Sequence, residues 1–479
     1  MSQGIRPFVR FLDGETVRSV VEEAKRILAE LGVFVEHERA LDLLEAAGIR
    51  VDREQRQAWI GPELVDRAVE SAPSGVRLYD RDGQNPIHIG GDDVNFDPGS
   101  AAIQVFDYEQ GRARPALIED CVRFARLTDR LPAMALQSTC VVPKDVPLDE
   151  ADRRRLYVAL SHGRKGVITG TFAHESFEIM RNMLLAVRGS SDRLRAKPLA
   201  IFDCCPSPPL KWSELTCAVL VRCAEEGIPA ELVSMPLTGA TSPVTLLGAV
   251  VQHTAENLSG VVIHQLAGAG SPIIYGGSPS AFDMRQGTTP MGAVETMMID
   301  SAYAQVGRHL GLPTHAYMAL SDAKTPDYQA GLESGYGAIM AALAGVNMVS
   351  GPGMLDFESC QSLEKLVLDN EACEMALRAV AGICRRDDVM ALDVIREGLA
   401  AEQFLNLNHT RQWFRKELSF PGAVIDRQVG EMWAAQGGRT AFERAHSEVE
   451  RLLGQEGEAA APLDPGVQRE LDELIGADS

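Results

Sequence analysis

Eight short apolar segments recur through the middle of the chain, and a Gly or Pro introduces most of them. The segments are GDDVNFDPG (91–99), LPAMALQST (131–139), RKGVITGT (164–171), AKPLAIFDCC (196–205), GIPAELVSMP (227–236), GSPIIYGGS (270–278), GLPTHAYMAL (311–320) and AGVNMVSGPG (344–353). Between them lie stretches of helical periodicity, such as IEDCVRFARLTDRL and AVETMMIDSAYAQVGRHLG. Short unalternating apolar strands separated by amphipathic helices are typical of a parallel sheet buried on both faces.

Eight parallel strands are the number that closes a (β/α)8 barrel, and about 260 residues of repeat fits the usual size of that fold. A doubly wound open sheet is the alternative, but no Gly-rich phosphate fingerprint opens the first unit. We therefore predict an α/β fold, a TIM barrel with N-terminal and C-terminal helical extensions. Residues 1–90 are predicted to form a helical cap with a short β excursion, residues 91–385 the catalytic barrel, and residues 386–479 a helical extension. The flanking helices are expected to cover barrel faces or to join subunits of a homo-oligomer.

Charge and cysteine content narrow the possible partners. The 479-residue chain has a formal net charge of −21, which disfavours binding to nucleic-acid phosphates. No run of about 18 apolar residues is present, so no membrane-spanning helix is predicted. The N-terminal stretch lacks the apolar region of a signal peptide, and nine scattered cysteines without metal-ligand spacing fit reduced cytoplasmic thiols. We expect a cytoplasmic protein that binds no metal itself.

Residues at the carboxyl ends of the predicted strands are the candidates for the site, because barrel enzymes carry their chemistry there. These ends hold aromatic rings, hydroxyls and a few carboxylates, which suit recognition of a ligand by shape, cation–π attraction and hydrogen bonds. His315 starts a strand and is therefore expected at the opposite, structural end of the barrel. The predicted substrate-binding residues are Phe96, Asp97, Phe202, Tyr275, Arg285, Tyr317, Ser350 and Phe357. Each aromatic residue has a ring in the core as its alternative, and Arg285 has a salt bridge with Asp283.

The segment SDAKTPDYQAG (321–331) places polar residues between an apolar strand and an apolar helix. Thr325, Pro326 and Asp327 predict a helix start, with Thr as N-cap and Pro in the first position. Asp322 and Lys324 then fall in the loop after a barrel strand, and Gln329 falls in the first turn of the following helix. We predict that Asp322, Lys324 and Gln329 are catalytic, although a Lys between two Asp residues is also a common loop ion pair.

Three stretches of the chain resemble a known family. They are SDAKTPDYQAGLESGYGAIMAALAGVNMVSGPGMLDF (321–357), LEKLVLDNEACEMA (363–376) and GSPSAFDMRQGTTPMGAVETMMIDSAYAQVGRHLGLPTH (277–315). They are similar to the trimethylamine methyltransferase (MttB-like) family of corrinoid-dependent methyltransferases, and the similarity extends from about residue 10 to residue 385. The resemblance implies a (β/α)8 barrel. It also implies methyl transfer from a methylated amine to the Co(I) corrinoid of a separate small carrier protein.

One departure from the family bears on the substrate. The founding members contain pyrrolysine, which the resemblance places at the strand end before the SDAK segment, where this chain has Leu320. A protonated tertiary amine is a poor methyl donor, whereas a quaternary ammonium already carries a neutral amine as its leaving group. The resemblance therefore implies a quaternary amine such as glycine betaine, with Arg285 as the partner of its carboxylate.

Three alternatives stay open from the sequence. The first is a methyltransferase for a tertiary amine such as dimethylglycine. The second is a catalytically silent barrel that binds a quaternary amine or the corrinoid protein. The third is a zinc-dependent corrinoid methyltransferase, for which only Cys204 and Cys205 lie at a strand end, too close together for a normal tetrahedral pair.

Overall fold

The computed structural model describes residues 5–386, 390–454 and 462–476. Eight parallel strands within these residues pair in the orders β14-β13-β11-β10-β9 and β15-β16-β6. Two parallel bridges, Phe96 with Met134 and Tyr275 with Thr314, join the edges of the two sheets and close the ring. This closure confirms the predicted barrel. The strands are β6 (Asn95–Asp97), β9 (Gln137–Ser138), β10 (Val167–Thr169), β11 (Ala200–Cys204), β13 (Ala230–Leu232), β14 (Ile273–Ile274), β15 (His315–Tyr317) and β16 (Met348–Ser350).

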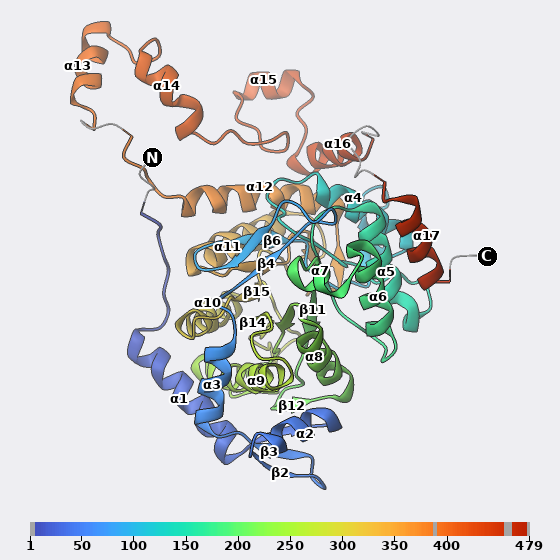
Figure 1. Cartoon of the computed structure of the whole chain (residues 1–479). Helices are drawn as coiled ribbons and strands as arrows, with labels where there is room; N and C mark the ends of the chain where they lie inside the picture. The colour runs from blue at the N-terminus through green and yellow to red at the C-terminus, as the bar shows by residue number, and fades with distance from the viewer. Residues whose placement is uncertain (1–4, 387–389, 455–461, 477–479) are drawn as a thin grey trace.

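A helix follows each strand and packs on the outside of the barrel (Figure 1). The largest hydrophobic cluster fills the space between the strands and these helices. Glycines in the left-handed conformation end several of them, as Gly227 does for α8 and Gly345 for α11. The helices are α4 (Ile118–Asp129), α5 (Leu148–His162), α6 (Ser176–Arg188) with α7 (Ser191–Ala196), α8 (Glu214–Glu226), α9 (Leu246–Ala267), α10 (Val294–His309), α11 (Tyr328–Ala344) and α12 (Leu363–Val380).

The N-terminal helices form a layer beside the barrel. Helices α1 (Gly14–Glu30) and α3 (Pro62–Ser71) pack on α9, as does α2 (Glu38–Ala46). A small sheet that the sequence did not predict lies with them, in the order β12-β1-β3-β2. Its strands are β1 (Val33–Val35), β2 (Arg50–Asp52), β3 (Gln57–Trp59) and β12 (Lys211–Trp212). Because β12 belongs to the segment after β11, this sheet ties the N-terminal layer to the barrel.

A hairpin closes the amino-terminal end of the barrel. Strands β4 (Gly75–Leu78) and β5 (Ile87–Gly90) pair antiparallel, and their apolar side chains pack on an inward-facing layer of the barrel strands. We call this layer, together with the hairpin, the floor. Its buried side chains are Val76, Leu78, Ile89, Leu136, Ile168, Ile201, Ile274 and Met348. Water has no polar group to bind among these side chains, so the floor seals one end of the barrel.

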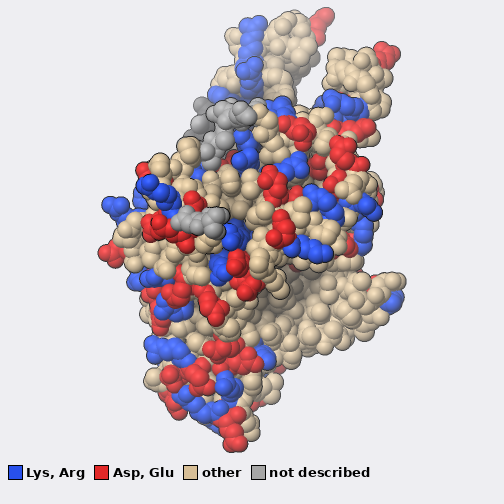
Figure 2. All heavy atoms as spheres, turned by 90° about the vertical axis from the view of Figure 1, so that its right-hand side faces the viewer, with Lys and Arg blue, Asp and Glu red and all other residues tan. Residues whose placement is uncertain are grey.

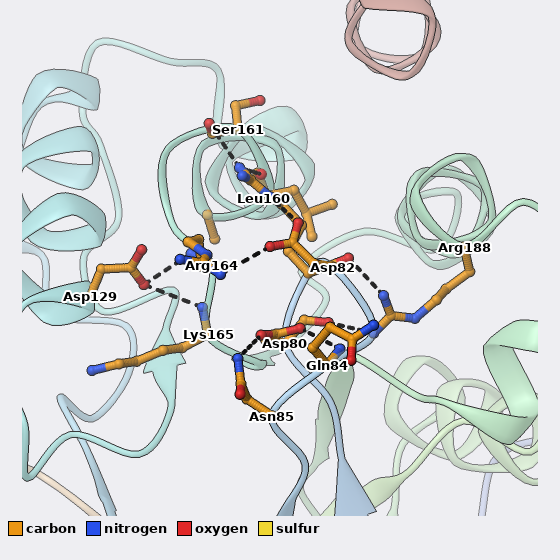
Figure 3. Close-up of polar contacts among 12 residues, drawn as sticks. Asp80, Asp82, Gln84, Asn85, Asp129, Leu160, Ser161, Arg164, Lys165 and Arg188 are labelled. Atoms are coloured by element: carbon orange, nitrogen blue, oxygen red, sulfur yellow. Dashed lines mark hydrogen bonds and ion pairs between the residues drawn. The ribbon is translucent and has the colours of Figure 1, made fainter. Parts of the chain in front are cut away.

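Polar contacts hold the turn of this hairpin in place (Figure 3). The Arg188 guanidinium of α6 donates to the backbone carbonyls of Asp80 and Arg81, at 2.7 Å each. Arg164, before β10, pairs with Asp82 at 3.1 Å. The turn is therefore attached to two neighbouring βα units, which positions the apolar strands of the hairpin beneath the barrel.

A second sheet lies at the carboxyl-terminal end, the mouth. Strands β7 (Gln104–Asp107) and β8 (Arg112–Pro115) follow β6, while β17 (Met354–Leu355) and β18 (Cys360–Gln361) follow β16. They pair in the order β17-β18-β7-β8. Phe106 of this sheet packs edge-on against Phe442 of α16 (Ala441–Leu453), with ring centroids 6.0 Å apart. The loops after the first and last barrel strands are thus joined into one ordered unit.

The C-terminal part has two unlike portions. Helices α13 (Leu392–Ala401), α14 (Asn408–Glu417) and α15 (Gly430–Ala435) lie apart from the barrel, at the upper left and top of Figure 1. Helix α16 packs on α12 and α4, and α17 (Pro465–Leu474) packs on α6. The division of the chain at residues 90 and 385 stays a prediction. Residues 387–389, 455–461 and 477–479 of the last segment lie outside the described part.

Charge is mixed on the surface. On the face drawn in Figure 2, Lys and Arg are interspersed with Asp and Glu, and a hollow lined mainly by uncharged residues separates the upper and lower parts. Among the described residues, no helix is both long and apolar enough to cross a membrane.

Candidate active site

A polar layer lies inside the barrel above the floor. Side chains alternate between the two faces of a strand, so residues two positions after the floor residues face inward again. Ile201 is followed in this way by Asp203, and Met348 by Ser350. The strand register carries the layer around the barrel: Asp97 and Tyr317 lie opposite Ser350, and Glu231 lies opposite Asp203.

Four residues of this layer form a continuous chain of contacts. The Ser350 hydroxyl donates to Asp97 Oδ2 at 2.7 Å, and His315 Nε2 lies 2.9 Å from the same hydroxyl oxygen. On its other side, His315 Nδ1 contacts Glu231 Oε1. His315, Glu231 and Asp97 are each fully buried. We call this group, with Asp203, the acid layer.

The position of His315 corrects our expectation that it belongs to the structural end of the barrel. It does begin β15, but its side chain reaches Ser350, at the end of the neighbouring strand. In the strand register His315 lies opposite Met348, and its side chain reaches diagonally to Ser350, two residues further along the neighbouring strand.

The hydrogen bonds of Ser350 fix the tautomer of His315. Ser350 has a single hydroxyl proton and gives it to Asp97, so its oxygen accepts from His315 Nε2–H. His315 Nδ1 and Glu231 Oε1 lie in contact, but neither has a hydrogen-bond partner among the described residues. Burial lowers the pKa of His315 to about 4 and raises the pKa of Glu231 well above its usual value, which favours a neutral acid beside a neutral imidazole. Burial also raises the pKa of Asp97 to about 7.

Asp203 is the member of the layer that lies nearest to open space. Its Oδ1 is buried without a hydrogen-bond partner among the described residues. Burial, and next the Glu231 carboxyl, raise its pKa well above the usual value. A Cβ placed on Gly170, in the segment after β10, would meet only Asp203, at 3.7 Å. A methyl group added at Gly170 would therefore lie in ordinary contact with the Asp203 side chain.

The predicted catalytic Asp322 lies at the mouth and joins two loops. Its carboxylate accepts from the backbone N–H groups of Met291 at 2.9 Å and Gly292 at 3.0 Å. Those residues belong to the loop after β14, whereas Asp322 belongs to the loop after β15. Asp322 is buried, and burial, with the nearby Glu333 carboxylate second, raises its pKa to about 6.

The predicted catalytic Gln329 acts on the same loop through Glu333. Gln329 Nε2 donates to Glu333 Oε1 at 2.9 Å, and Glu333 Oε2 accepts from Ser321 Oγ at 2.6 Å and from Asp322 N at 2.9 Å. Helix α11 starts at Tyr328, with the Asp327 carboxylate as its cap, which corrects the predicted Thr325 N-cap. The contacts of Asp322, Gln329 and Glu333 all hold in place the loop after β15 that begins at Ser321.

Lys324 and Phe357 meet at the rim of the mouth. Lys324 Nζ lies 3.8 Å from the centroid of the Phe357 ring and 3.4 Å from Asp356. Asp356, Phe357 and Glu358 all have left-handed backbone, with φ of 50°, 53° and 67°. Three such residues in a row are costly for side chains other than Gly, and strain of this kind clusters at functional sites. Burial, and next the Asp322 carboxylate, raise the pKa of Glu358 to about 8.

Three of the predicted aromatic residues face outward, into the helix layer. The Phe202 ring packs on Phe177 of α6, with centroids 5.1 Å apart, and the Tyr275 hydroxyl donates to Thr254 of α9 at 3.0 Å. Phe96 belongs to the same outer cluster. The sequence predicted their positions at strand ends. Side chains alternate between the two faces of a strand, however, and these three lie on the face that points away from the barrel interior. We leave these three out of the candidate site.

Arg285 is placed differently from the other predicted residues. Its side chain is 86% exposed and pairs with Asp283 at 2.7 Å. The structure brings Asp97, Ser350 and Tyr317 together in the barrel, and brings Asp322, Lys324 and Phe357 together at the mouth. Arg285 lies in the solvent-exposed part of the loop after β14, with its charge already paired.

Sequence reasoning missed Glu231, His315 and Glu358. A usable signal was present for the first, because Glu231 is a single charged residue inside the apolar strand Ala230–Leu232. Charged residues are rarely buried without a partner or a function. Within the described residues, no group of three or more His, Cys, Asp and Glu side chains could hold a metal ion.

Comparison with known proteins adds the family. The model of the trimethylamine methyltransferase (MTTB) family matches residues 2–477. The chain belongs to the trimethylamine methyltransferase family. Relatives include the trimethylamine methyltransferase MttB of Desulfitobacterium hafniense strain DSM 10664 / DCB-2, 30% identical over 96% of this chain and 92% of that protein. The glycine betaine methyltransferase of D. hafniense strain Y51 is also 30% identical, over 98% and 97%.

A solved structure shares the fold of this family member. The monomethylamine methyltransferase MtmB of Methanosarcina barkeri superimposes with a TM-score of 0.50 at 11% sequence identity, covering 91% of this chain and 93% of that one. At this identity the likeness concerns the fold alone. It agrees with the closed barrel described above.

Proposed function

We propose that this protein transfers a methyl group from a quaternary amine of the betaine type to the Co(I) corrinoid of a separate carrier protein. The observation that carries the proposal is the acid layer inside the barrel of a methyltransferase-family chain. Asp97, Asp203 and Glu231 are gathered there with one imidazole, and carboxylate oxygens of Asp203 and Glu231 lack hydrogen-bond partners among the described residues. A permanent cation is the ligand charge that would compensate such a layer.

Leu320, three residues after the end of β15, supports a quaternary rather than a tertiary amine. Leu320 is 1% exposed and packs beside Gly351, so this position offers apolar contact and no reactive group. A quaternary ammonium needs no activation, because its leaving group is already a neutral amine. Orientation of the methyl group and exclusion of water are then the main contributions that the protein has to make.

The mouth fits the approach of a corrinoid held by another protein. The segments after β13 and β14 expose apolar side chains at the rim, and such a surface favours contact with a partner. Met235, Val244, Leu247, Met284 and Val294 are each 38% to 65% exposed. The corrinoid supplies a strong nucleophile for the methyl carbon. The floor closes the other end of the barrel, so the partner would have to approach from the mouth.

Residues at different depths in the barrel would have different roles in the reaction. The acid layer would hold the cationic head group inside the barrel, with the Tyr317 ring at its upper edge. The loops joined by Asp322 and Glu333 would surround the substrate and exclude water. Because the positive charge on nitrogen disappears as the methyl group leaves, binding that is too strong for the cation would slow the reaction.

The test is a methyl-transfer assay under anaerobic conditions. The purified protein is given reduced cobalamin, or a reduced corrinoid carrier, and a panel of methylated amines, and the spectrum of the corrinoid is followed. Glycine betaine, carnitine or proline betaine should react, and trimethylamine should not. Equal rates with trimethylamine and every betaine would refute the proposed preference for quaternary amines. No reaction with any amine would favour a catalytically silent binding barrel.

A tertiary amine such as dimethylglycine is the second candidate. The raised pKa values of Asp97 and Glu358, to about 7 and about 8, make each a possible proton donor to an amine nitrogen. Reaction with dimethylglycine and not with betaines would select this candidate.

We also propose that the apolar side chains exposed on α13, such as Leu399, contribute to a homo-oligomer.

A further inference from the structure

The acid layer has an unusual charge balance for a barrel interior. The charged and titratable groups that face Asp203 are Asp97 of β6, Glu231 of β13, His315 and Tyr317 of β15, and Arg155 of α5. Arg155 is committed elsewhere, because it donates to the Thr139 carbonyl and lies over the Phe172 ring at 5.0 Å. The carboxyls therefore lack a full set of cationic partners, and in the empty layer they must hold protons.

Two independent features point to a ligand at this layer. Glu231 is fully buried, and its Oε2 has no hydrogen-bond partner in the described part of the chain. Asp203 Oδ1 is also without a partner among the described residues, and the Asp203 side chain borders Gly170, where an added Cβ would lie 3.7 Å from its Cβ and 3.8 Å from its Oδ2. Buried polar atoms are nearly always satisfied in folded proteins, so two such atoms side by side indicate that another group completes the layer.

We propose that Asp203 is the counterion of the ammonium group of the substrate, and that binding a permanent cation there expels one proton from the Asp203–Glu231–His315 group. The identity of the cation rests on the proposed function. A positive charge within about 4–6 Å of a carboxyl strongly favours its ionised form. A quaternary ammonium has no proton to give, so the charge balance must be restored by a proton that leaves the protein.

During the reaction the acid layer takes back the proton that it released when the substrate bound. When the methyl group leaves, the electron pair of the C–N bond stays on nitrogen, and the product is a neutral tertiary amine. The cation has then gone from the layer, and the acid group takes one proton back from water. The charge of the layer thus follows the charge of the ligand.

Calorimetry measures the proton directly. Glycine betaine, and tetramethylammonium as a minimal cation, are titrated into the protein in phosphate and in Tris buffer near neutral pH. The dependence of the binding enthalpy on the buffer gives the number of protons released. We expect about one proton per molecule bound. The carbon isostere of glycine betaine, in which a quaternary carbon replaces nitrogen, should bind at least about tenfold more weakly and release none.

Asp203→Asn should abolish the proton release and weaken glycine betaine binding by at least about tenfold. Asp283→Asn is the matched control, because Asp283 lies in a mouth loop and pairs with Arg285, and it should release the proton as the unaltered protein does. Gly170→Ala should also weaken binding, because the new methyl group fills the space beside Asp203 without a steric clash. This variant provides the test if Asp203→Asn does not fold.

The outcomes separate this inference from the proposed function. Methyl transfer from betaines without proton release would overturn the inference and leave the function in place. Proton release on cation binding without any methyl transfer would support the inference and remove the function. Unchanged release in Asp203→Asn, equal binding of the carbon isostere, or failure to bind any of the cations would each refute the counterion role.

Discussion

The floor and the acid layer are built from the same strands, two residues apart, yet they have opposite chemistry. Ile201 belongs to the floor and Asp203 to the acid layer, and Met348 and Ser350 stand in the same relation. The floor is apolar and sealed by the hairpin β4–β5. The acid layer is also largely buried, with Asp203 its least buried member, but it carries carboxylate oxygens without hydrogen-bond partners among the described residues. The floor should therefore be open to change without loss of the acid layer, and the two layers can be tested separately.

The largest effect should come from the floor. Ile201→Ala removes a fully buried side chain from a closed apolar layer, and the free energy of unfolding should fall by about 2–5 kcal/mol. Chemical denaturation measures this loss. The Kd for glycine betaine should stay unchanged, because Ile201 is not part of the acid layer. A large change in Kd with little change in stability would mean that the two layers are not independent.

Ser350→Ala tests the acid layer itself. The change leaves His315 Nε2 and Asp97 Oδ2 without their shared hydroxyl partner, which should cost about 1–3 kcal/mol of unfolding free energy. Methyl transfer should slow as well, unlike in Ile201→Ala. Ser350→Thr keeps a hydroxyl and should retain more activity than Ser350→Ala. Full activity in Ser350→Ala would show that the chain of contacts has only a structural role.

The pH dependence of stability should distinguish the mouth, where Glu358 lies, from the floor. Burial raises the pKa of Glu358 from 4.5 to about 8, so the folded state favours its neutral form. Its contribution is complete below pH 4.5 and is lost as the pH rises through about 8. The free energy of unfolding should therefore fall across this range, and Glu358→Gln should make the fall shallower. Ile201→Ala should lower the whole curve without changing its slope.

The smallest effect is expected at the surface. Arg285→Ala removes an 86% exposed side chain, and stability should change by no more than about 0.5 kcal/mol. Because the guanidinium already pairs with Asp283, the KM for glycine betaine should change little. Steady-state kinetics with glycine betaine and with choline test this directly. A rise in KM for glycine betaine alone would contradict this expectation and would show that Arg285 binds the carboxylate of glycine betaine.

Much of the architecture could be predicted from the sequence because it depends on local patterns. Each of the eight apolar segments contains one barrel strand, and the helical stretches between them contain helices, as IEDCVRFARLTDRL contains α4. The mouth sheet and the small N-terminal sheet were missed. Their strands are two to four residues long and pair with segments distant in the chain, as β1 does with β12. The barrel strands are equally short, but their regular alternation with helices marks them, and these strands lie outside that alternation.

The sequence by itself determined the order of strands and helices, the eightfold count and the family, because each is written in periodicity and residue identity along the chain. Only the tertiary structure decided which strand-end residues meet. Phe202 and Asp203 are adjacent in sequence, yet the pleat turns one toward α6 and the other into the barrel. Closure of the barrel places His315 between Glu231 and Ser350, which lie 119 residues apart. Pleat phase and barrel closure follow from hydrogen bonding among all eight strands, so no single segment could reveal them.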